Sequence, residues 1–328
     1  MKAILYTKYG PPDVLELHEV DKPIPKGDEV LVRVHAASIN ALEWRRFTLP
    51  KIMVRIMGGG LREPKDKSFG ADFAGHVEAV GDGVRQYKPG DEVFGVRRGS
   101  FAEYVCAPEK WIALKPANIS FEAAAAIPVA ALTALQAVRD QGKIQAGQKV
   151  LIHGAGGGVG TFAVQIAKAL GAAVSAVCGP RNLEVVRAAG ADRVIDYTKE
   201  DFTNSGQQYD LIVAANGYRS IFDYKRALKP NGKYVVVGGD LTQMLQALVI
   251  GPFLSRSGRK MTGMMTRPNH DDLVFLKELI EAGKFVPVVD RCYPLAQAIE
   301  AHRYVLEGHV RGKVILTNEA TGGPIPPH

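Results

Sequence analysis

One segment near the middle of this 328-residue chain restricts its fold more than any other. The apolar run KVLIH at residues 149–153 is followed by the turn GAGGGVG and then by TFAVQIAKALG, which has helical spacing. Four more apolar runs of strand length come later, AVSAVC, RVIDY, YDLIVAA and KYVVVGG, separated by helical stretches. Continuous apolar strands joined by amphipathic helices are typical of a parallel sheet covered on both faces. We therefore predict a doubly wound α/β domain.

The first 119 residues have a different pattern. Short apolar runs are split by Pro and Gly, and Glu29–Val34 alternates polar with apolar residues, which predicts β-strands in a compact, partly closed sheet. Helical spacing with interleaved basic residues follows from Trp44 to Met57, and GGGLREPKDKSFG is predicted to be a loop. This part of the chain is therefore mainly β.

Three features set the expected boundaries of the domains. Ser120 is placed to cap a helix that begins FEAAAAI, and Gly142 is placed to end LTALQAVRDQG as a C-cap. After residue 285 come a helix and one alternating strand, which needs neighbours in the first sheet, and then GGPIPPH, predicted to be a disordered tail. We predict a domain made of residues 1–119 and 286–328, with a doubly wound domain, 120–285, inserted in it.

Composition excludes several classes of protein. The net charge of +7 comes from scattered basic residues without an aromatic-basic RNA motif, so we expect no nucleic-acid partner. The most apolar stretches are too interrupted to span a bilayer, and the N-terminus lacks the order of a signal peptide, so we expect no membrane partner and a cytoplasmic location. Cys106, Cys178 and Cys292 are widely separated, which predicts free thiols rather than disulfides or a thiolate zinc site.

The glycine turn indicates a dinucleotide site. Its spacing is Gly154-x-x-Gly157-x-x-Gly160, with Ala155 at the place of the first glycine of the usual GxGxxG pattern. Gly157 would let the backbone approach a pyrophosphate, and Gly160 would let the helix pack closely on the strand. Gly158 and Val159 begin the helix, whose free N–H groups and positive dipole end favour phosphates. The alternative is a tight turn with a purely structural role.

The end of the second strand indicates which dinucleotide binds. NAD-binding domains place an acid there to hold the ribose hydroxyls. Here the sequence is AVCGPRN, in which Gly179, Arg181 and Asn182 form a small basic pocket suited to a 2′-phosphate. This favours NADPH over NADH, although Arg181 is alternatively a surface charge on the next helix.

These motifs resemble those of a known family. VLIHGAGGGVGTFAVQIAKALGA, GADRVIDY, LKPNGKYVVVGG and EGHVRGKVIL, with the earlier VHAASINALEW and PVAALTALQAV, are similar to the zinc-less quinone oxidoreductase-like branch of the medium-chain dehydrogenase/reductase superfamily. The resemblance spans residues 1–317. It implies a GroES-like substrate domain, a Rossmann domain that binds NADPH, and a homodimer.

The resemblance also suggests particular cofactor contacts. Asn40 and Thr133 match residues near the nicotinamide half, and Tyr197 matches a tyrosine beside the adenosine 2′-phosphate. Asn216, Val237, Gly238 and Gly239 follow later strands, where the cofactor should cross the edge of the sheet. Structural alternatives remain: a helix residue for Thr133, a half-buried aromatic for Tyr197 and a turn former for Asn216.

No metal is expected. Zinc-dependent relatives hold zinc with a Cys and a His at the places of Asn40 and Ala71, and neither residue replaces the missing ligand. The residues from Val93 to Tyr104 also lack the four cysteines of a structural zinc lobe.

Without a metal, the chemistry best supported is hydride transfer from NADPH to an electrophilic quinone or α,β-unsaturated carbonyl. Candidate catalytic residues are Asn40, Glu43 and Trp44. Glu43 is alternatively a carboxylate on a helix surface, and Trp44 an ordinary core residue. The histidines His35, His76, His153 and His309 are interpreted as packed or exposed rather than as proton donors. Two alternatives are a zinc-type alcohol dehydrogenase and a catalytically idle NADPH-binding sensor or scaffold.

Overall fold

The computed structural model describes residues 1–217, 219–239, 241–255 and 258–318, without the side chains of Met57 and Leu241. The predicted disordered tail, GGPIPPH, lies outside the described residues. The chain forms two compact units, each described by itself. Unit 1 consists of Met1–Val129, Pro268–Glu281 and the chain from Val289 onward, and unit 2 consists of Ala130–Arg267 and Ala282–Val288.

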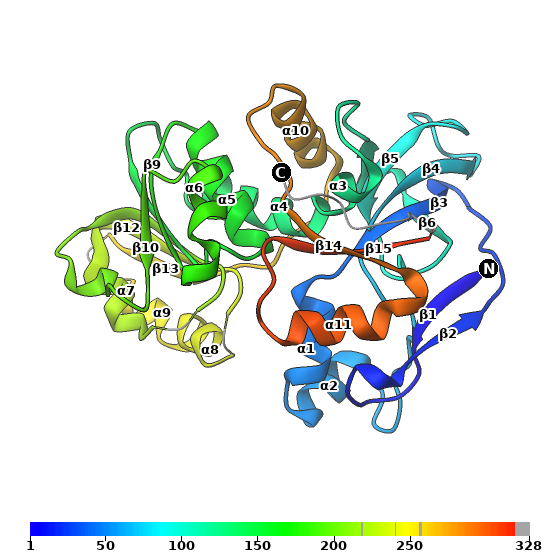
Figure 1. Ribbon diagram of the computed structural model, residues 1–328, viewed down its shortest axis with the longest axis horizontal. Coiled ribbons are helices and arrows are strands. Elements are labelled where there is room, and N and C mark those ends of the chain that lie inside the picture. Colours follow the sequence, from blue (N-terminus) through cyan, green and yellow to red (C-terminus); the bar gives the residue numbers. More distant parts are fainter. Residues whose placement is uncertain (218, 240, 256–257, 319–328) are drawn as a thin grey trace. The chain divides into compact units, whose positions relative to one another are not determined.

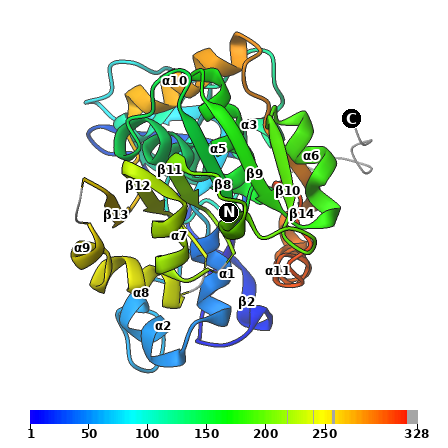
Figure 2. The ribbon, with the colours of Figure 1, turned by 90° about the vertical axis from the view of Figure 1, so that its left-hand side faces the viewer.

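Unit 2 contains the predicted parallel sheet. Its strands are β8 (Lys149–His153), β9 (Ala173–Cys178), β10 (Arg193–Asp196), β11 (Tyr209–Ala214), β12 (Leu228–Val236) and β13 (Lys260–Gly263). Every pairing among them is parallel, in the order β10-β9-β8-β11-β12-β13. Figure 2 shows the strands side by side in this order. The order reverses between β8 and β11, the point at which doubly wound folds bind dinucleotides.

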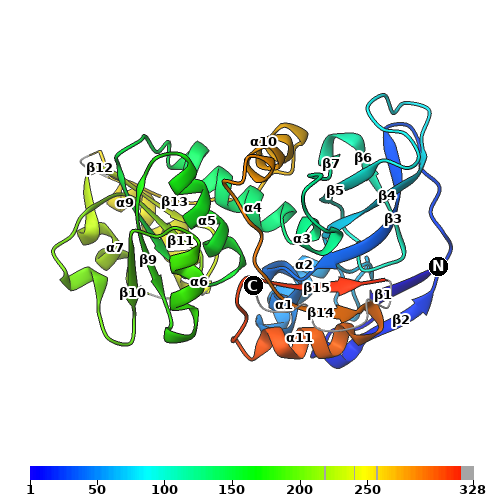
Figure 3. The same ribbon diagram turned by 45° about the horizontal axis from the view of Figure 1, so that its top comes forward.

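Helices cover both faces of this sheet. They are α5 (Gly158–Ala169), α6 (Leu183–Ala188), α7 (Ile221–Ala227), α8 (Leu241–Val249) and α9 (Gly251–Leu254). Figures 1 and 3 show α5 and α6 on one side of the strands and α7 and α9 on the other. The strands are buried accordingly, with Leu151, Ile212 and Val236 in one core cluster. The doubly wound fold is confirmed, while β13 was not predicted.

Gly142 is the C-cap, as predicted, but it is not left-handed. Helix α4 (Pro128–Leu135) continues into a π-helical turn, Gln136–Gln141, after which Gly142 is still right-handed with φ −66°. The left-handed residue is Lys143, at φ 49°. A Cβ on Gly142 would lie 2.5 Å from Leu211 Cδ2. A glycine is therefore needed here for close packing on β11 rather than for a left-handed turn.

Unit 1 is mainly β, as predicted. Its strands are β1 (Lys2–Tyr6), β2 (Leu15–Glu19), β3 (Glu29–Ser38), β4 (Asp72–Val80), β5 (Glu92–Val96), β6 (Tyr104–Pro108), β7 (Ile112–Leu114), β14 (Val289–Pro294) and β15 (Lys313–Thr317). β1 pairs with β2, and the remainder form a sheet in the order β14-β15-β3-β4-β5-β7 with β6 also on β3. β15 pairs antiparallel with β3, which confirms that the final strand returns to the first sheet.

The helices of unit 1 lie around this sheet. They are α1 (Ala41–Thr48), α2 (Lys51–Gly58), α3 (Phe121–Ala125), α10 (His270–Glu281) and α11 (Ala298–Leu306), and Figure 3 shows α11 beside β14. Ser120 caps α3 as predicted, since its Oγ accepts the Ala123 N–H at 3.3 Å. Unit 1 includes α3 and α10, whereas the predicted limits 120 and 285 assigned both to the inserted domain.

Candidate cofactor and catalytic sites

The glycine turn of unit 2 connects β8 to α5. Gly154 has φ 85°, a left-handed conformation that favours glycine, and Gly157 is the N-cap of α5. A Cβ on Gly160 would overlap the Gly154 carbonyl oxygen, so Gly160 brings the helix close to the turn that follows β8, whereas the predicted contact was with the strand. A Cβ on Gly157 would meet only Gly154 O, at 3.8 Å.

This turn fits a pyrophosphate. The space next to Gly157 is open, and the first N–H groups of α5, at Gly158 and Val159, belong to the helix end that carries partial positive charge. Both residues are partly exposed. The residues present therefore suit a dinucleotide whose phosphates lie over the turn.

Four predicted residues gather where β9 and β10 end. Gly179 follows β9, and a Cβ there would lie 3.3 Å from the ring of Tyr197, which is 55% exposed. The Asn182 side chain lies against Gly156 of the glycine turn, and its Oδ1 is buried without a hydrogen-bond partner. Arg181 is exposed beside them. An unpaired buried amide oxygen next to the phosphate turn is a group that a ligand can satisfy.

An acid that the sequence interpretation missed lies at the same edge. Asp196 ends β10 and pairs in register with Cys178, the last residue of β9. Its Oδ1 accepts the backbone N–H and the hydroxyl of Thr198, and these bonds lower the pKa of its carboxyl, whereas Oδ2 is buried without a partner. No acid follows β9, as the sequence showed, but the neighbouring strand β10 ends in the acid Asp196.

The ends of β11 and β12 meet the glycine turn. The backbone N–H of Asn216 donates to His153 O at 3.2 Å, and a Cβ on Gly154 would overlap the Asn216 backbone. Val237 and Gly238 donate to Ala214 O at 3.0 and 3.4 Å. These residues, with Gly239, form a continuous edge of backbone at the carboxyl ends of β8, β11 and β12.

Thr133 lies on α4 and is 6% exposed. Its hydroxyl makes a 2.5 Å hydrogen bond with the hydroxyl of Thr266, which follows β13. The hydroxyl pair ties α4 to the loop after the last strand of the sheet.

In unit 1, the predicted Asn40 is part of a buried charged cluster. Its Nδ2 donates to Asp72 Oδ2 at 2.9 Å and to Ser38 O at 3.3 Å, and its Oδ1 accepts from Lys313 Nζ at 2.6 Å. Lys313 also donates to Ile39 O and lies 3.6 Å from Asp72 Oδ2. Asp72 is fully buried and Lys313 is 4% exposed. Both amide hydrogens of Asn40 are therefore used inside this unit.

Further bonds complete the partners of Asp72. Its Oδ2 also accepts from the Ser38 hydroxyl at 2.8 Å, and its Oδ1 accepts the Val129 N–H at 2.9 Å. Burial raises the pKa of Asp72, while Lys313 and these donors lower it. Burial also lowers the pKa of the Lys313 ammonium. The pair is a charged, hydrogen-bonded unit inside apolar surroundings, an arrangement concentrated at functional sites.

Glu43 is the third ionisable group of this cluster. It is 5% exposed at the start of α1, and its Oε2 accepts the Asn40 N–H at 2.7 Å, one half of a capping box. Burial and, to a smaller extent, the negative charge of Asp72 raise the pKa of Glu43 to about 7, against the opposing effect of Lys313. The cluster has two carboxyls for one ammonium, so Glu43 holds a proton near neutral pH.

The raised pKa gives a testable pH dependence of stability. Because the folded pKa is about 7 and the ordinary value is 4.5, the stabilising contribution is complete below about pH 4.5 and is lost as the pH rises through 7. The loss amounts to about 3 kcal/mol between pH 4.5 and 8. In Glu43→Gln, which preserves the N-cap acceptor, we expect this loss to be missing from urea unfolding curves measured across that range. Parallel pH profiles of the two proteins would contradict the assignment.

Comparisons with known proteins agree with this geometry. Residues 26–117 match the family model described as an alcohol dehydrogenase GroES-like domain, and residues 189–316 match the model described as a zinc-binding dehydrogenase. The chloroplast envelope quinone oxidoreductase homolog of Arabidopsis thaliana is 34% identical, with 96% of this chain and 98% of that protein covered. The chain belongs to the quinone oxidoreductase-like branch of the medium-chain dehydrogenase/reductase superfamily. It is thus an oxidoreductase with a nicotinamide cofactor.

One further relative and one solved structure are also similar to this chain. The NADPH-dependent alkenal/one oxidoreductase of Arabidopsis thaliana, a chloroplastic protein, is also 34% identical, with 96% of this chain and 79% of that protein covered. The solved quinone oxidoreductase from Coxiella burnetii superposes with a TM-score of 0.85 at 32% identity, covering 97% of this chain and 99% of that one. This oxidoreductase therefore has the two-domain fold that the sequence predicted.

Elsewhere in this oxidoreductase, the cysteines have no reactive setting. Burial raises the pKa of the thiols of Cys106, Cys178 and Cys292 to about 11, so few thiolates form near neutral pH. Among the described residues, no three His, Cys, Asp or Glu side chains group as metal ligands would. Nor does any helix in the described ranges have the length and apolar character needed to cross a bilayer.

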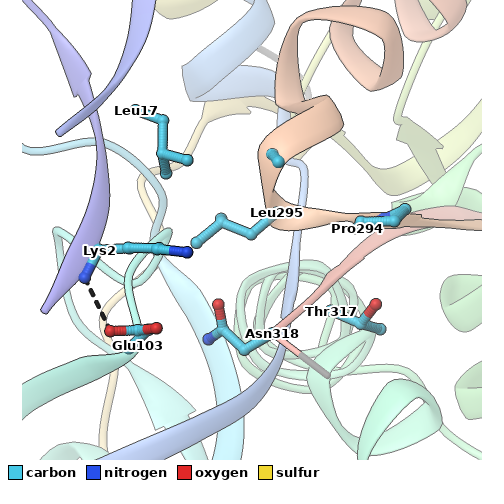
Figure 4. Close-up of a pocket in the computed structure, with 8 residues that line it drawn as sticks. Lys2, Leu17, Glu103, Pro294, Leu295, Thr317 and Asn318 are labelled. Carbon is cyan, nitrogen blue, oxygen red and sulfur yellow. Dashed lines mark hydrogen bonds between the residues drawn. The ribbon is translucent and has the colours of Figure 1, made fainter. Parts of the chain in front are cut away.

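Unit 1 also contains the predicted Trp44 and, elsewhere on its surface, a pocket. Trp44 packs partly buried against the apolar core of unit 1, with the Arg45 guanidinium 5.6 Å from its ring. A pocket of about 210 Å³ lies near Lys2 of β1 and Thr317 of β15. Figure 4 shows the residues that line it, among them Lys2, whose backbone N–H donates to Glu103 Oε2. Leu17, Leu295 and Asn318 also line it. No residue of the predicted site lines this pocket.

Proposed function

We propose that this oxidoreductase is a zinc-independent reductase that uses NADPH to reduce a quinone or an α,β-unsaturated carbonyl compound. One observation carries the proposal. The position at which zinc relatives have a cysteine is occupied by Asn40, whose side chain is bonded on both ends to the buried Lys313 and Asp72. An amide in that state is not a zinc ligand, so the acceptor must be electrophilic by itself.

When bound, NADPH supplies a hydride from its nicotinamide ring. The residues of unit 2 would bind and orient it: the turn from Gly154 to Gly160 holds the pyrophosphate, and the edge from Asn216 to Gly239 supports the nicotinamide half. Arg181, Asn182 and Tyr197 would surround the adenosine 2′-phosphate. Asn40 is a candidate for the nicotinamide half on the resemblance alone, because its side-chain amide is already bonded to Lys313, Asp72 and Ser38.

The preference for NADPH is open to a direct test. Arg181→Ala is expected to raise the Kd for NADPH by about ten- to a hundredfold, because a charge-assisted hydrogen bond contributes about 1.5–3 kcal/mol. The Kd for NADH should stay within about twofold, as measured by quenching of protein fluorescence. Arg187→Ala on the same segment is the control, since Arg187 pairs with Glu184. Equal losses for both cofactors, or tighter NADH in the wild type, would instead assign Asp196 to the ribose hydroxyls.

The names of the relatives support the choice of acceptor. One relative is named a quinone oxidoreductase homolog and another an alkenal/one oxidoreductase. Quinones and enones share the property that hydride addition at one carbon places the charge on a delocalised oxygen. Proton delivery can then come from water, and Glu43 and Trp44 remain the candidate catalytic residues of this chain beside Asn40.

The decisive experiment offers metal-stripped protein an ortho-quinone and a linear enone in parallel, with NADH as the control cofactor. Turnover of either acceptor, with NADPH preferred, is the expected result. Activity that returns only on adding zinc would favour the zinc-type alcohol dehydrogenase. Tight NADPH binding without turnover of any acceptor would favour the sensor or scaffold.

We also propose a homodimer in the cytoplasm without nucleic-acid or membrane partners. The exposed apolar side chains of α8 and α9, Leu248 and Phe253 among them, and the edge strand β13 support a subunit interface. Free cysteines support a reducing compartment. Sedimentation velocity tests the dimer, and a monomer at micromolar concentration would reject it.

A further inference from the structure

A buried polar network lies directly beneath the cofactor edge of unit 2. His153 is the last residue of β8, immediately before the glycine turn, and is 6% exposed. Its Nδ1 lies 2.6 Å from the hydroxyl of Tyr224, and Gln243 Nε2 lies 3.0 Å from that hydroxyl and 2.8 Å from the hydroxyl of Tyr234. The four side chains come from four different elements, β8, α7, α8 and β12. The network therefore depends on the tertiary fold and is not formed by a local turn.

The direction of the hydrogen bonds follows from the donors. Gln243 Nε2 has two hydrogens and serves both tyrosine hydroxyls, which leaves Gln243 Oε1 as one buried acceptor without a partner. The opposite amide orientation would leave two N–H groups unpaired, which is costlier. Tyr224 therefore receives a hydrogen from Gln243 and donates its own to His153 Nδ1. This makes Nε2 the protonated nitrogen of the His153 ring.

The protonated nitrogen faces the edge of the sheet. Nε2 has no hydrogen-bond partner among the residues that the structure describes. It lies 2.7 Å from the position that a Cβ on Gly217 would take, and Gly217 follows Asn216 at φ 96°. Because Gly217 has no side chain, it does not cover the Nε2–H of His153. This N–H has no partner among the described residues and is not enclosed by them, so it is available to an acceptor from a bound ligand or from water.

The charge of the ring suits this position. Burial and the nearby Arg219 lower the pKa of His153 to about 4, against a smaller opposing effect of Asp201. Phe202, which is apolar, packs against the ring. Burial raises the pKa of Tyr224, so its hydroxyl stays protonated near neutral pH. His153 is thus a neutral donor near neutral pH.

We propose that His153 is a cofactor-binding residue, which donates from Nε2 to an oxygen of the dinucleotide where it crosses the turns at Gly154 and Gly217, and that Tyr224 and Gln243 are positioning residues that fix its tautomer. The proposal rests on the proposed nicotinamide chemistry but concerns binding alone. The oxygen belongs to the part common to NADPH and NADH, because the 2′-phosphate pocket lies at the ends of β9 and β10.

Binding measurements without any acceptor test this assignment. His153→Phe keeps the ring packing and removes the donor, and is expected to raise the Kd of NADPH and of NADH by the same factor, about five- to tenfold. His153→Gln, which places an amide N–H near the same point, should recover most of the loss. Tyr224→Phe should weaken binding about threefold. A Kd within twofold of the wild type for folded His153→Phe would overturn the proposal.

The chain offers a matched control. His302 in unit 1 is fully buried, its pKa is likewise lowered to about 4 by burial, and its Nε2 also has no partner but is enclosed by the chain. His302→Phe should leave both dissociation constants unchanged. If it weakens binding as much as His153→Phe, the effect is general loss of packing and the proposal fails.

A second measurement works even if His153→Phe does not fold. In the wild-type protein labelled with 15N-histidine, the His153 Nε2 signal should be that of a protonated nitrogen and should shift on adding NADP+. The His302 signals should stay in place. A His153 protonated on Nδ1, or one unmoved by saturating NADP+, would overturn the assignment. Absence of acceptor turnover would bear on the proposed function only, since neither experiment uses an acceptor.

Discussion

Replacing Lys313 by methionine is expected to lower the free energy of unfolding by about 3–5 kcal/mol, because it leaves the Asp72 charge buried without its counter-ion. Asp72 is fully buried, and Lys313 Nζ is 3.6 Å from its Oδ2. The change also removes the donor to Asn40 Oδ1 and to Ile39 O. Urea unfolding at pH 8, where Glu43 is ionised as well, should show the largest loss.

Two controls separate burial of charge from loss of a lysine. Lys277→Met removes a partly exposed partner from the Lys277–Glu281 pair on α10 and should cost less than about 0.5 kcal/mol. Adding Asp72→Asn to Lys313→Met removes the stranded charge and should recover more than half of the loss. A single Lys313→Met protein within 1 kcal/mol of the wild type, which is the scale of one ordinary hydrogen bond, would show that the pair contributes little.

The sequence predicts much of this molecule because its main signals are local. The strands β8 to β12 each contain a short apolar run, and the glycine spacing is typical of a strand, a turn and a helix in that order. The need for a small residue at position 160 follows from the same pattern, although the close contact is with Gly154 of the turn and not with the strand. The return of β15 to β3 follows from the need of a lone strand for neighbours.

What the sequence does not predict depends on distant contacts. Lys313 and Asp72 are far apart in the chain, and lysine is ordinarily exposed, so nothing local marks Lys313 as 4% exposed. The network of His153, Tyr224 and Gln243 likewise joins three elements. At Gly142 the π-helical turn moved the left-handed residue to Lys143, which propensity alone does not predict. The nearest signal in the sequence is a polar residue at the end of an apolar strand: Lys313 in GKVIL and His153 in VLIHG.

The second large effect concerns the glycine turn and separates stability from binding. Gly160→Ala places a methyl group against the Gly154 carbonyl and should lower the free energy of unfolding by about 2 kcal/mol or more, although Gly→Ala inside a helix ordinarily stabilises by up to about 1 kcal/mol. Gly157→Ala meets nothing closer than 3.8 Å and should cost less than about 1 kcal/mol, the usual penalty of alanine at an N-cap.

Gly157→Ala should weaken the binding of NADPH although it changes the free energy of unfolding little. The added methyl fills the open space where the pyrophosphate would approach the backbone, so the Kd for NADPH should rise at least about tenfold, equivalent to 1.4 kcal/mol. Thermal unfolding with and without NADPH measures both quantities in one experiment. If Gly157→Ala keeps wild-type affinity, the open space is a structural turn, and the phosphates of the cofactor bind elsewhere on the sheet edge.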